Sequence, residues 1–298
     1  MNKNIFIWTE IINVGKIGKI ALESFRKYHP NLHVFIYGKW DDFEWIDPLE
    51  LDNATYVALG SDNDIVQSFN KGHEGTAKLW AKLIQERPEK YMIHFDSDII
   101  FRGDVVQDII TRIEEGYDLI GAVRNYKNNL CHNDDVRHLQ DVCATGCFAF
   151  NRELISNFDY NTLTSMCQGI HNPLGHPVMD FFDPVMFDIL KNGGKISFLD
   201  FDDVGGCNNQ GSRNNKYSEL NNMNAAFKIE FGEKMSHFSA VGSGMNFFHN
   251  SEKIRNVPSS YRDYAIDRYA LFCKIFYNED IGIDVSQYNS LFNGIEWY

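Results

Sequence analysis

Two aspartates with one residue between them follow an apolar stretch in the first half of the chain. The stretch is Tyr91–Phe95, and Asp96, Ser97 and Asp98 come directly after it. A short apolar run of this kind predicts a buried strand of a parallel sheet. Ligands of open α/β sheets bind at the carboxyl ends of the strands, and carboxylates there can hold a divalent cation together with phosphate oxygens. We therefore predict a metal site at Asp96 and Asp98, and two acids that cap the following turn are the alternative interpretation.

A histidine in the second half of the chain is the next candidate ligand. His237 and Phe238 are followed by a segment that contains Gly242, Ser243 and Gly244. A histidine at a strand end can ligate a metal, and a glycine-rich turn after it can offer backbone N–H groups to phosphate. For His237 taken alone, a packed histidine is the alternative.

Gly146 begins an apolar stretch that leads into Asn151 and Arg152. A glycine at the start of a strand lets the backbone approach a ligand closely. The alternative is an ordinary strand with a glycine bend.

Two acids precede a later helix and could act as a base. Asp180 and Asp183 come before an apolar helical pattern that Gly193 or Gly194 ends, and Pro184 suits the first helical turn. Either carboxylate could take the proton of an attacking hydroxyl. The alternative for Asp183 is a helix N-cap.

The elements that position these residues alternate between strand and helix patterns, which indicates parallel β-α units in an α/β fold. Strands are predicted over residues 4–9, 33–37, 55–59, 91–95, 119–123, 146–150 and 195–200, and helices over 16–28, 76–86, 105–113, 184–192 and 259–277. Thr9 ends the first strand, at the edge where a donor would bind. Polar loops are predicted over 125–141 and 202–216.

Composition limits the classes of function. The 298 residues are 44% hydrophobic and carry a net charge of −13, which disfavours broad binding of nucleic acid or other polyanions. None of the six cysteines forms a C-x-x-C pair, so we expect reduced thiols and no zinc site. No signal peptide is apparent, and no apolar run reaches the roughly 18 residues that a membrane span needs. We expect a cytoplasmic protein.

Taken together, the acid pair, the glycine-led strand with Asn151-Arg152 and the His237-Phe238 pair resemble the glycogenin-like and lipopolysaccharide-type glycosyltransferases of the GT-A fold. The resemblance covers roughly Ile5 to Phe247. It implies a Rossmann-like, mostly parallel central sheet flanked by helices, as a single domain over residues 1–250. A helical extension over 251–298 would pack on this domain.

The same resemblance implies a metal-dependent hexosyl- or pentosyltransferase. Mn²⁺ or Mg²⁺ would bind Asp98 and His237, with Asp96 on the metal or the ribose, and a nucleotide-sugar, specifically a UDP-sugar, would be the donor. The segment Lys78-Leu79-Trp80 resembles a helix whose lysine reaches the donor phosphates. The catalytic candidates are Asp183 and Asp180, and the donor-binding candidates are Thr9, Lys78, Asp96, Ser97, Gly146, Gly242, Ser243 and Gly244.

Two departures from the family pattern concern the donor and the chemistry. Asp183-Pro184 replaces the usual Asp-Gln pair, so the glutamine is absent. Ser243-Gly244-Met245 replaces a Lys-Pro-Trp element, so a lysine contact to the pyrophosphate is absent. The resemblance favours retention at the anomeric carbon, whereas an inverting enzyme would use Asp180 or Asp183 as base.

Several alternatives remain open for the partners and the activity. The acceptor would be a hydroxyl of a glycan or a small molecule, and a hydroxylated base in a nucleic acid is an alternative that the net charge disfavours. A metal-dependent nucleotidyltransferase would use a similar acid pair, with Val14–Lys19 as its nucleotide loop. A carbohydrate-binding protein without activity is the third alternative.

Overall fold

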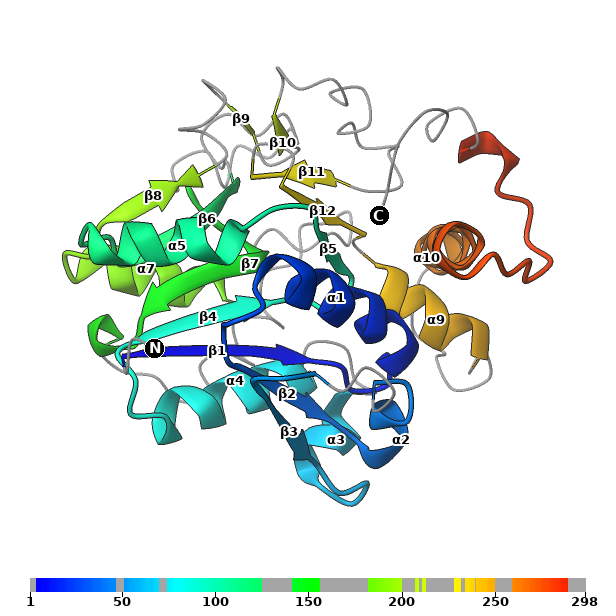
Figure 1. The fold of residues 1–298 in the computed structure, drawn as a ribbon, viewed down its shortest axis with the longest axis horizontal. Coiled ribbons are helices and arrows are strands. Elements are labelled where there is room, and N and C mark those ends of the chain that lie inside the picture. The colour runs from blue at the N-terminus through cyan, green and yellow to red at the C-terminus, as the bar shows by residue number, and fades with distance from the viewer. Residues whose placement is uncertain are drawn as a thin grey trace.

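The computed structural model (Figure 1) describes residues 4–46, 51–69, 74–124, 141–155, 182–199, 207–208, 211–212, 228–231, 234–238, 240–249 and 259–288. Asp180 and the predicted loop at residues 125–140 lie outside these ranges. The predicted loop over 202–216 is described only at β9 (Cys207–Asn208) and β10 (Gly211–Ser212), which pair as a short antiparallel ribbon.

A seven-stranded sheet in the order β3-β2-β1-β4-β7-β6-β8 forms the centre of the fold. All neighbouring strands are parallel except β7, which runs antiparallel to both β4 and β6. The prediction of an α/β fold with a mostly parallel central sheet is therefore confirmed. The strands are β1 (Ile5–Glu10), β2 (Val34–Gly38), β3 (Ala54–Ala58), β4 (Tyr91–Phe95), β6 (Leu119–Arg124), β7 (Val142–Asn151) and β8 (Ile196–Phe198).

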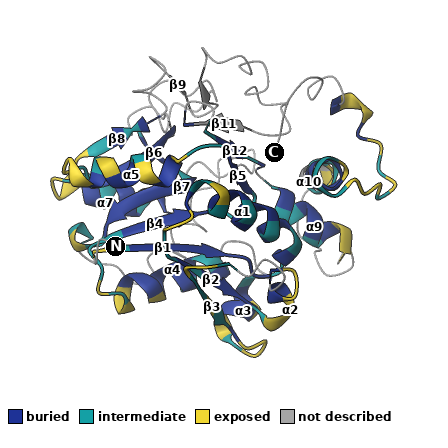
Figure 2. Ribbon diagram, viewed as in Figure 1, coloured by how far each residue is buried: buried dark blue, intermediate teal, exposed yellow. Residues whose placement is uncertain are grey.

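Helices cover both faces of this sheet, and the side chains of each strand alternate between two apolar cores (Figure 2). In β1, for example, Phe6 and Trp8 enter one core, whereas Ile7 enters the other. The first core lies under α3 (Asp64–Ser68), α4 (Glu74–Glu86) and α7 (Asp183–Lys191). The second lies under α1 (Gly15–Tyr28), α2 (Trp40–Phe43) and α5 (Val105–Glu114).

A small antiparallel sheet lies beside the carboxyl end of β4. Its strands are β11 (Lys228–Glu230), β12 (Met235–His237) and β5 (Ile99–Phe101), in that order. Because β5 follows the two aspartates after a single turn, any residue on β12 that pairs with the start of β5 must lie near those aspartates.

The C-terminal part of the described chain packs on α1 and α9 (Val241–His249). Helix α10 (Ser259–Phe272) lies so close to α9 that a Cβ on Gly244 would be 1.8 Å from the carbonyl oxygen of Ala265. A π-helical turn, Cys273–Tyr277, then brings the Tyr277 hydroxyl to the carbonyl oxygen of Lys16, to which it donates a hydrogen bond. None of the described helices has the length and the apolar character that crossing a bilayer requires.

Candidate functional site

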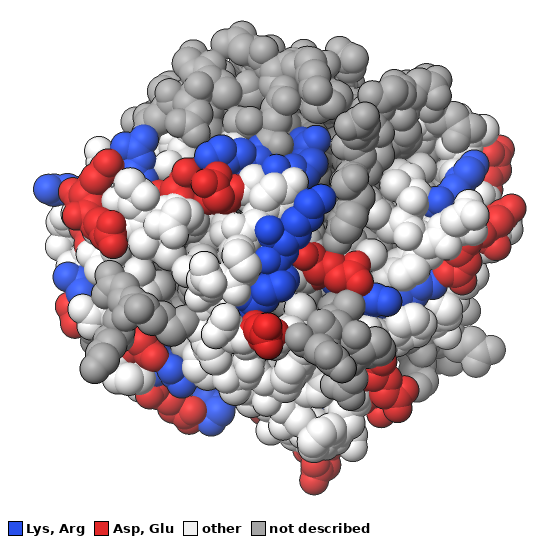
Figure 3. Space-filling model, in the orientation of Figure 1, with Lys and Arg blue, Asp and Glu red and all other residues white. Residues whose placement is uncertain are grey.

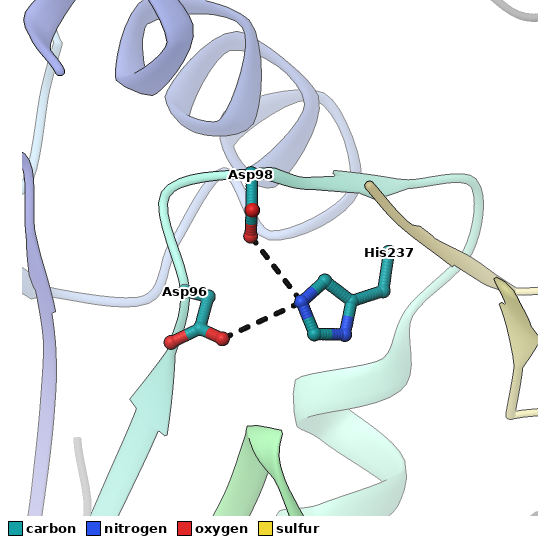
Figure 4. A group of neighbouring side chains, drawn as sticks. All are labelled: Asp96, Asp98 and His237. Atoms are coloured by element: carbon teal, nitrogen blue, oxygen red, sulfur yellow. Dashed lines mark ion pairs between the residues drawn. The ribbon is translucent and has the colours of Figure 1, made fainter. Parts of the chain in front are cut away.

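Asp96, Asp98 and His237 meet at the carboxyl end of β4 (Figure 4). One ligand atom from each lies within 4.8 Å of the others. Nε2 of His237 is 3.3 Å from Oδ1 of Asp98 and 3.5 Å from Oδ2 of Asp96. The side chain of Asp96 is 37% exposed, while those of Asp98 and His237 are nearly buried, so the group is open to solvent on one side.

Backbone pairing explains why residues so distant in sequence come together. Strands β12 and β5 pair with His237 opposite Ile99, and the N–H of Phe238 donates to the carbonyl oxygen of Asp98 at 2.9 Å. On the other side, the N–H of Asp96 donates to the carbonyl oxygen of Gly146 at 2.7 Å. Three segments of the chain therefore fix the two aspartates and the histidine through main-chain hydrogen bonds.

Gly146 makes room for the imidazole of His237. A Cβ at this position would lie 2.7 Å from both Cε1 and Nδ1 of that ring. Real Cβ atoms are not found so close to other heavy atoms, so the absence of a side chain is what allows the ring to reach the aspartates. The predicted contact between Gly146 and the donor stays a prediction.

The charges of the site favour a cation. Loss of hydration raises the pKa of Asp96; His94 and His237 oppose this rise, and the carboxylates of Asp98 and Glu10 add to it. Acids that repel one another in this way are stabilised by a positive ion among them. Two carboxylates with one imidazole form a donor set that suits Mn²⁺, and the exposed side leaves space for oxygens of a ligand.

A buried polar network lies behind the aspartates, and the sequence interpretation missed it. Glu10 ends β1, His94 lies in β4, and Trp80 lies on α4. Nε1 of Trp80 donates to Glu10 at 3.0 Å, and Nε2 of His94 lies 3.0 Å from the other oxygen of Glu10. A histidine within an otherwise apolar strand, next to a strand that ends in glutamate, was the signal that could have revealed it.

The ammonium group of Lys78 lies among side-chain oxygens of the protein itself. Its ammonium lies 2.7 Å from Asp64, 3.1 Å from Glu74 and 2.6 Å from Oγ of Ser68. These three oxygens match the three protons of an ammonium group. A phosphate would have to replace one of them, and donor binding by Lys78 stays a prediction.

One expectation and one alternative interpretation about local structure are wrong. The segment with Gly242, Ser243 and Gly244 is not a turn, because it forms the first half of α9, and the close approach at Gly244 is to α10. Asp183 is not an N-cap. It is the first residue of α7, it is buried, and Phe182 takes the cap position.

The other candidates are placed as follows, and their roles stay predictions. Thr9 is fully buried in β1. Ser97 is half-buried in the turn between β4 and β5. The stretch Val14–Lys19, considered as a nucleotide loop, leads into and forms the start of α1. There the ammonium of Lys16 pairs with Glu279 and lies 4.8 Å from the centre of the Tyr277 ring.

Charged side chains of both signs lie on the surface of the described residues. On the face drawn in Figure 3, acidic and basic side chains of the described residues occur in neighbouring patches. Basic side chains form a band that runs from the upper part of the described surface toward its centre, with acidic side chains beside it.

Comparison with known proteins finds likeness in structure alone. No protein-family model and no curated protein matches the sequence. The galactosyltransferase LgtC, solved with donor and acceptor sugar analogues, is 11% identical, with a TM-score of 0.46 over 87% of this chain and 99% of that chain. Mouse xyloside xylosyltransferase 1 is 11% identical, with a TM-score of 0.43 over 78% of this chain and 96% of that chain.

A third similar structure is named for a different activity. The 4-diphosphocytidyl-2C-methyl-D-erythritol synthase from Anaerococcus prevotii is 15% identical, with a TM-score of 0.37 over 66% of this chain and 87% of that chain. All three TM-scores lie below 0.5.

Proposed function

We propose that this chain is a metal-dependent glycosyltransferase that moves a sugar from a nucleotide-sugar, specifically a UDP-sugar, to an acceptor hydroxyl. The observation that supports this proposal is the convergence of Asp96, Asp98 and His237, with their ligand atoms within 4.8 Å of one another. The position also agrees, because the three residues lie outside the carboxyl end of a central strand, where α/β sheets bind nucleotides.

Each residue of the group has a role in this proposal. Asp98 and His237 hold Mn²⁺ or Mg²⁺, and Asp96 contacts the metal or the donor ribose. When bound, the cation neutralises the charge that grows on the leaving diphosphate. The main-chain hydrogen bonds of Asp96 and Phe238 fix the ligand positions before the donor arrives, which limits the entropy that binding costs.

The acceptor side of the proposal rests on the acids near α7. Asp183 is the catalytic candidate among the described residues, and it lies at the start of a helix whose N-terminal end carries a partial positive charge. Asp180 is the second candidate. The family resemblance favours retention, and NMR analysis of the product anomer decides between retention and inversion. A glycan or a small molecule is the proposed acceptor, since a net charge of −13 disfavours nucleic acid.

A panel of nucleotide-sugars incubated with Mn²⁺ tests the proposal. We expect one donor to be consumed with release of free nucleoside diphosphate, and we expect Asp98→Asn to abolish the reaction in a folded protein. Asp263→Asn is the matched control, since Asp263 is an exposed aspartate on α10. Full activity of Asp98→Asn contradicts the assignment.

The same assay separates the proposal from the nucleotidyltransferase alternative. That activity releases pyrophosphate instead of a nucleoside diphosphate. The contacts of Val14–Lys19 do not favour a nucleotide loop there. The start of α1 lies under the C-terminal segment, and Lys16 is paired with Glu279. Titration of UDP with and without Mn²⁺ tests the third alternative, since a carbohydrate-binding protein without activity would show no metal-linked nucleotide binding.

A further inference from the structure

Three buried polar side chains form a chain that ends behind Asp96. Trp80 donates from Nε1 to Oε1 of Glu10, and Oε2 of Glu10 faces Nε2 of His94, each at 3.0 Å. His94 is fully buried, Trp80 is 1% exposed and Glu10 is 9% exposed. Polar groups cost free energy when they leave water, and apolar side chains could fill the same volume. A set of three in one place therefore calls for a role beyond packing.

His94 contacts the metal site at two points. Its Nε2 lies 3.8 Å from Oδ1 of Asp96, and its Nδ1 lies 3.3 Å from the carbonyl oxygen of Thr145. Thr145 precedes Gly146, whose carbonyl oxygen accepts the N–H of Asp96 and whose Cα leaves room for His237. One imidazole thus supports both the carboxylate of Asp96 and the strand against which the other ligand, His237, rests.

Each ring nitrogen of His94 has its own partner. A carbonyl oxygen can only accept, so Nδ1 donates to Thr145. Nε2 is hydrogen-bonded to Oε2 of Glu10, and Oδ1 of Asp96 lies 3.8 Å from the same nitrogen. The carboxylate of Glu10 therefore holds the edge of the imidazole that lies next to Asp96.

We propose that Glu10 and His94 are a positioning pair that holds Asp96 in the orientation in which it meets Asp98 and His237. The pair acts through Asp96 and does not touch the substrate. This inference rests on the proposed metal-dependent function, because it assigns the pair to the affinity of the same metal site. Replacing a residue that contacts a metal ligand and orients it typically lowers metal affinity by about 10- to 100-fold.

Glu10→Gln is the variant that tests the pair with the least structural change. The glutamine oxygen still accepts from Trp80, but the NH₂ group that replaces Oε2 cannot accept a hydrogen from Nε2 of His94. The side-chain volume is kept, whereas the carboxylate that holds the imidazole next to Asp96 is lost. We expect Mn²⁺ affinity, measured by EPR titration in the presence of UDP, to fall by about 10-fold or more.

Trp8→Phe is the matched control. The Trp8 ring is fully buried and its centre lies 5.1 Å from that of His94, yet its Nε1 has no hydrogen-bond partner among the described residues. The substitution therefore disturbs the packing around His94 without changing the network. We expect it to lower the free energy of unfolding, measured by chemical denaturation, and to leave Mn²⁺ affinity unchanged.

The outcomes separate this inference from the proposed function. Weaker Mn²⁺ binding in Glu10→Gln, with wild-type binding in Trp8→Phe, supports the positioning pair. Equal Mn²⁺ affinity in Glu10→Gln and the wild type, or an equal loss in both variants, overturns it. A wild-type chain that binds no Mn²⁺ with UDP overturns the proposed function itself. If Glu10→Gln does not fold, His94→Gln replaces it, and unchanged Mn²⁺ affinity in that variant overturns the inference.

Discussion

Replacing Gly146 with alanine is the sharpest perturbation that the structure offers. The new Cβ would lie 2.7 Å from Cε1 and Nδ1 of His237. Non-bonded carbon atoms pack at about 3.5 Å or more, so the imidazole must move by roughly 0.8 Å. Metal–ligand distances tolerate about 0.2 Å. The ring of His237 therefore leaves the position in which it can share a cation with the two aspartates.

We expect Gly146→Ala to weaken Mn²⁺ binding by about 10- to 100-fold, or roughly 1.4 to 2.8 kcal/mol. Gly146 does not have a positive φ, so alanine causes no backbone strain, and the protein should remain folded. Calorimetric titration with Mn²⁺ in the presence of UDP measures the effect. Transfer activity at limiting metal should fall in parallel, and should recover in part as Mn²⁺ is raised.

Gly121→Ala is the control for this experiment. On β6, its Cβ would lie 2.9 Å from Cβ of Phe148 and 3.0 Å from Cβ of Cys143, so it is nearly as crowded as Gly146 but faces the core. We expect a loss of stability of about 1 to 3 kcal/mol and no change in the Mn²⁺ affinity of the folded protein. Wild-type Mn²⁺ affinity in Gly146→Ala, with His237 unmoved in a crystal structure, would refute the reasoning.

Two further predictions concern stability. Gly244→Ala should lower the thermal unfolding temperature and leave Mn²⁺ affinity intact. The new Cβ would lie 1.8 Å from the carbonyl oxygen of Ala265 and would push α9 away from α10. An unchanged melting temperature would contradict this packing. Burial lowers the pKa of His29 from 6.5 to about 4, so between these values the unfolded chain binds a proton that the folded chain does not. The free energy of unfolding should therefore fall as pH drops from 6.5 to 4, by up to roughly 3 kcal/mol from this residue. His29→Leu should flatten that part of the pH profile, and an unchanged profile would show that His29 is not its source.

The local patterns of the sequence predicted the central sheet well. Strand β4 has the predicted bounds, Tyr91–Phe95, because a short apolar run between a helix and two acids has few other interpretations. The first helix differs by one residue, since its apolar positions recur with helical spacing over nearly four turns. Alternation of such elements along the chain was enough to indicate the α/β class.

What the sequence could not predict depends on contacts between distant segments. Strands β5 and β12 have three residues each, too few to show a period, yet their pairing brings His237 to Asp98. The glycines at 242 and 244 indicated a turn, because glycine disfavours helices, but the packing of α9 on α10 excludes a side chain at Gly244 and overrides that propensity. The hydrogen bond between Glu10 and His94 joins β1 to β4, which are far apart in the sequence. No local sequence pattern therefore indicates it.

In the proposed site, one cation is held jointly by Asp98 and His237, with Asp96 on the metal or the donor ribose. Anomalous X-ray scattering from a crystal soaked in Mn²⁺ and UDP tests it most directly. The account predicts a manganese peak among the three side chains, within bonding distance of Asp98 and His237 and next to the diphosphate. A UDP complex with no manganese between these residues, or with manganese bound elsewhere, would contradict it.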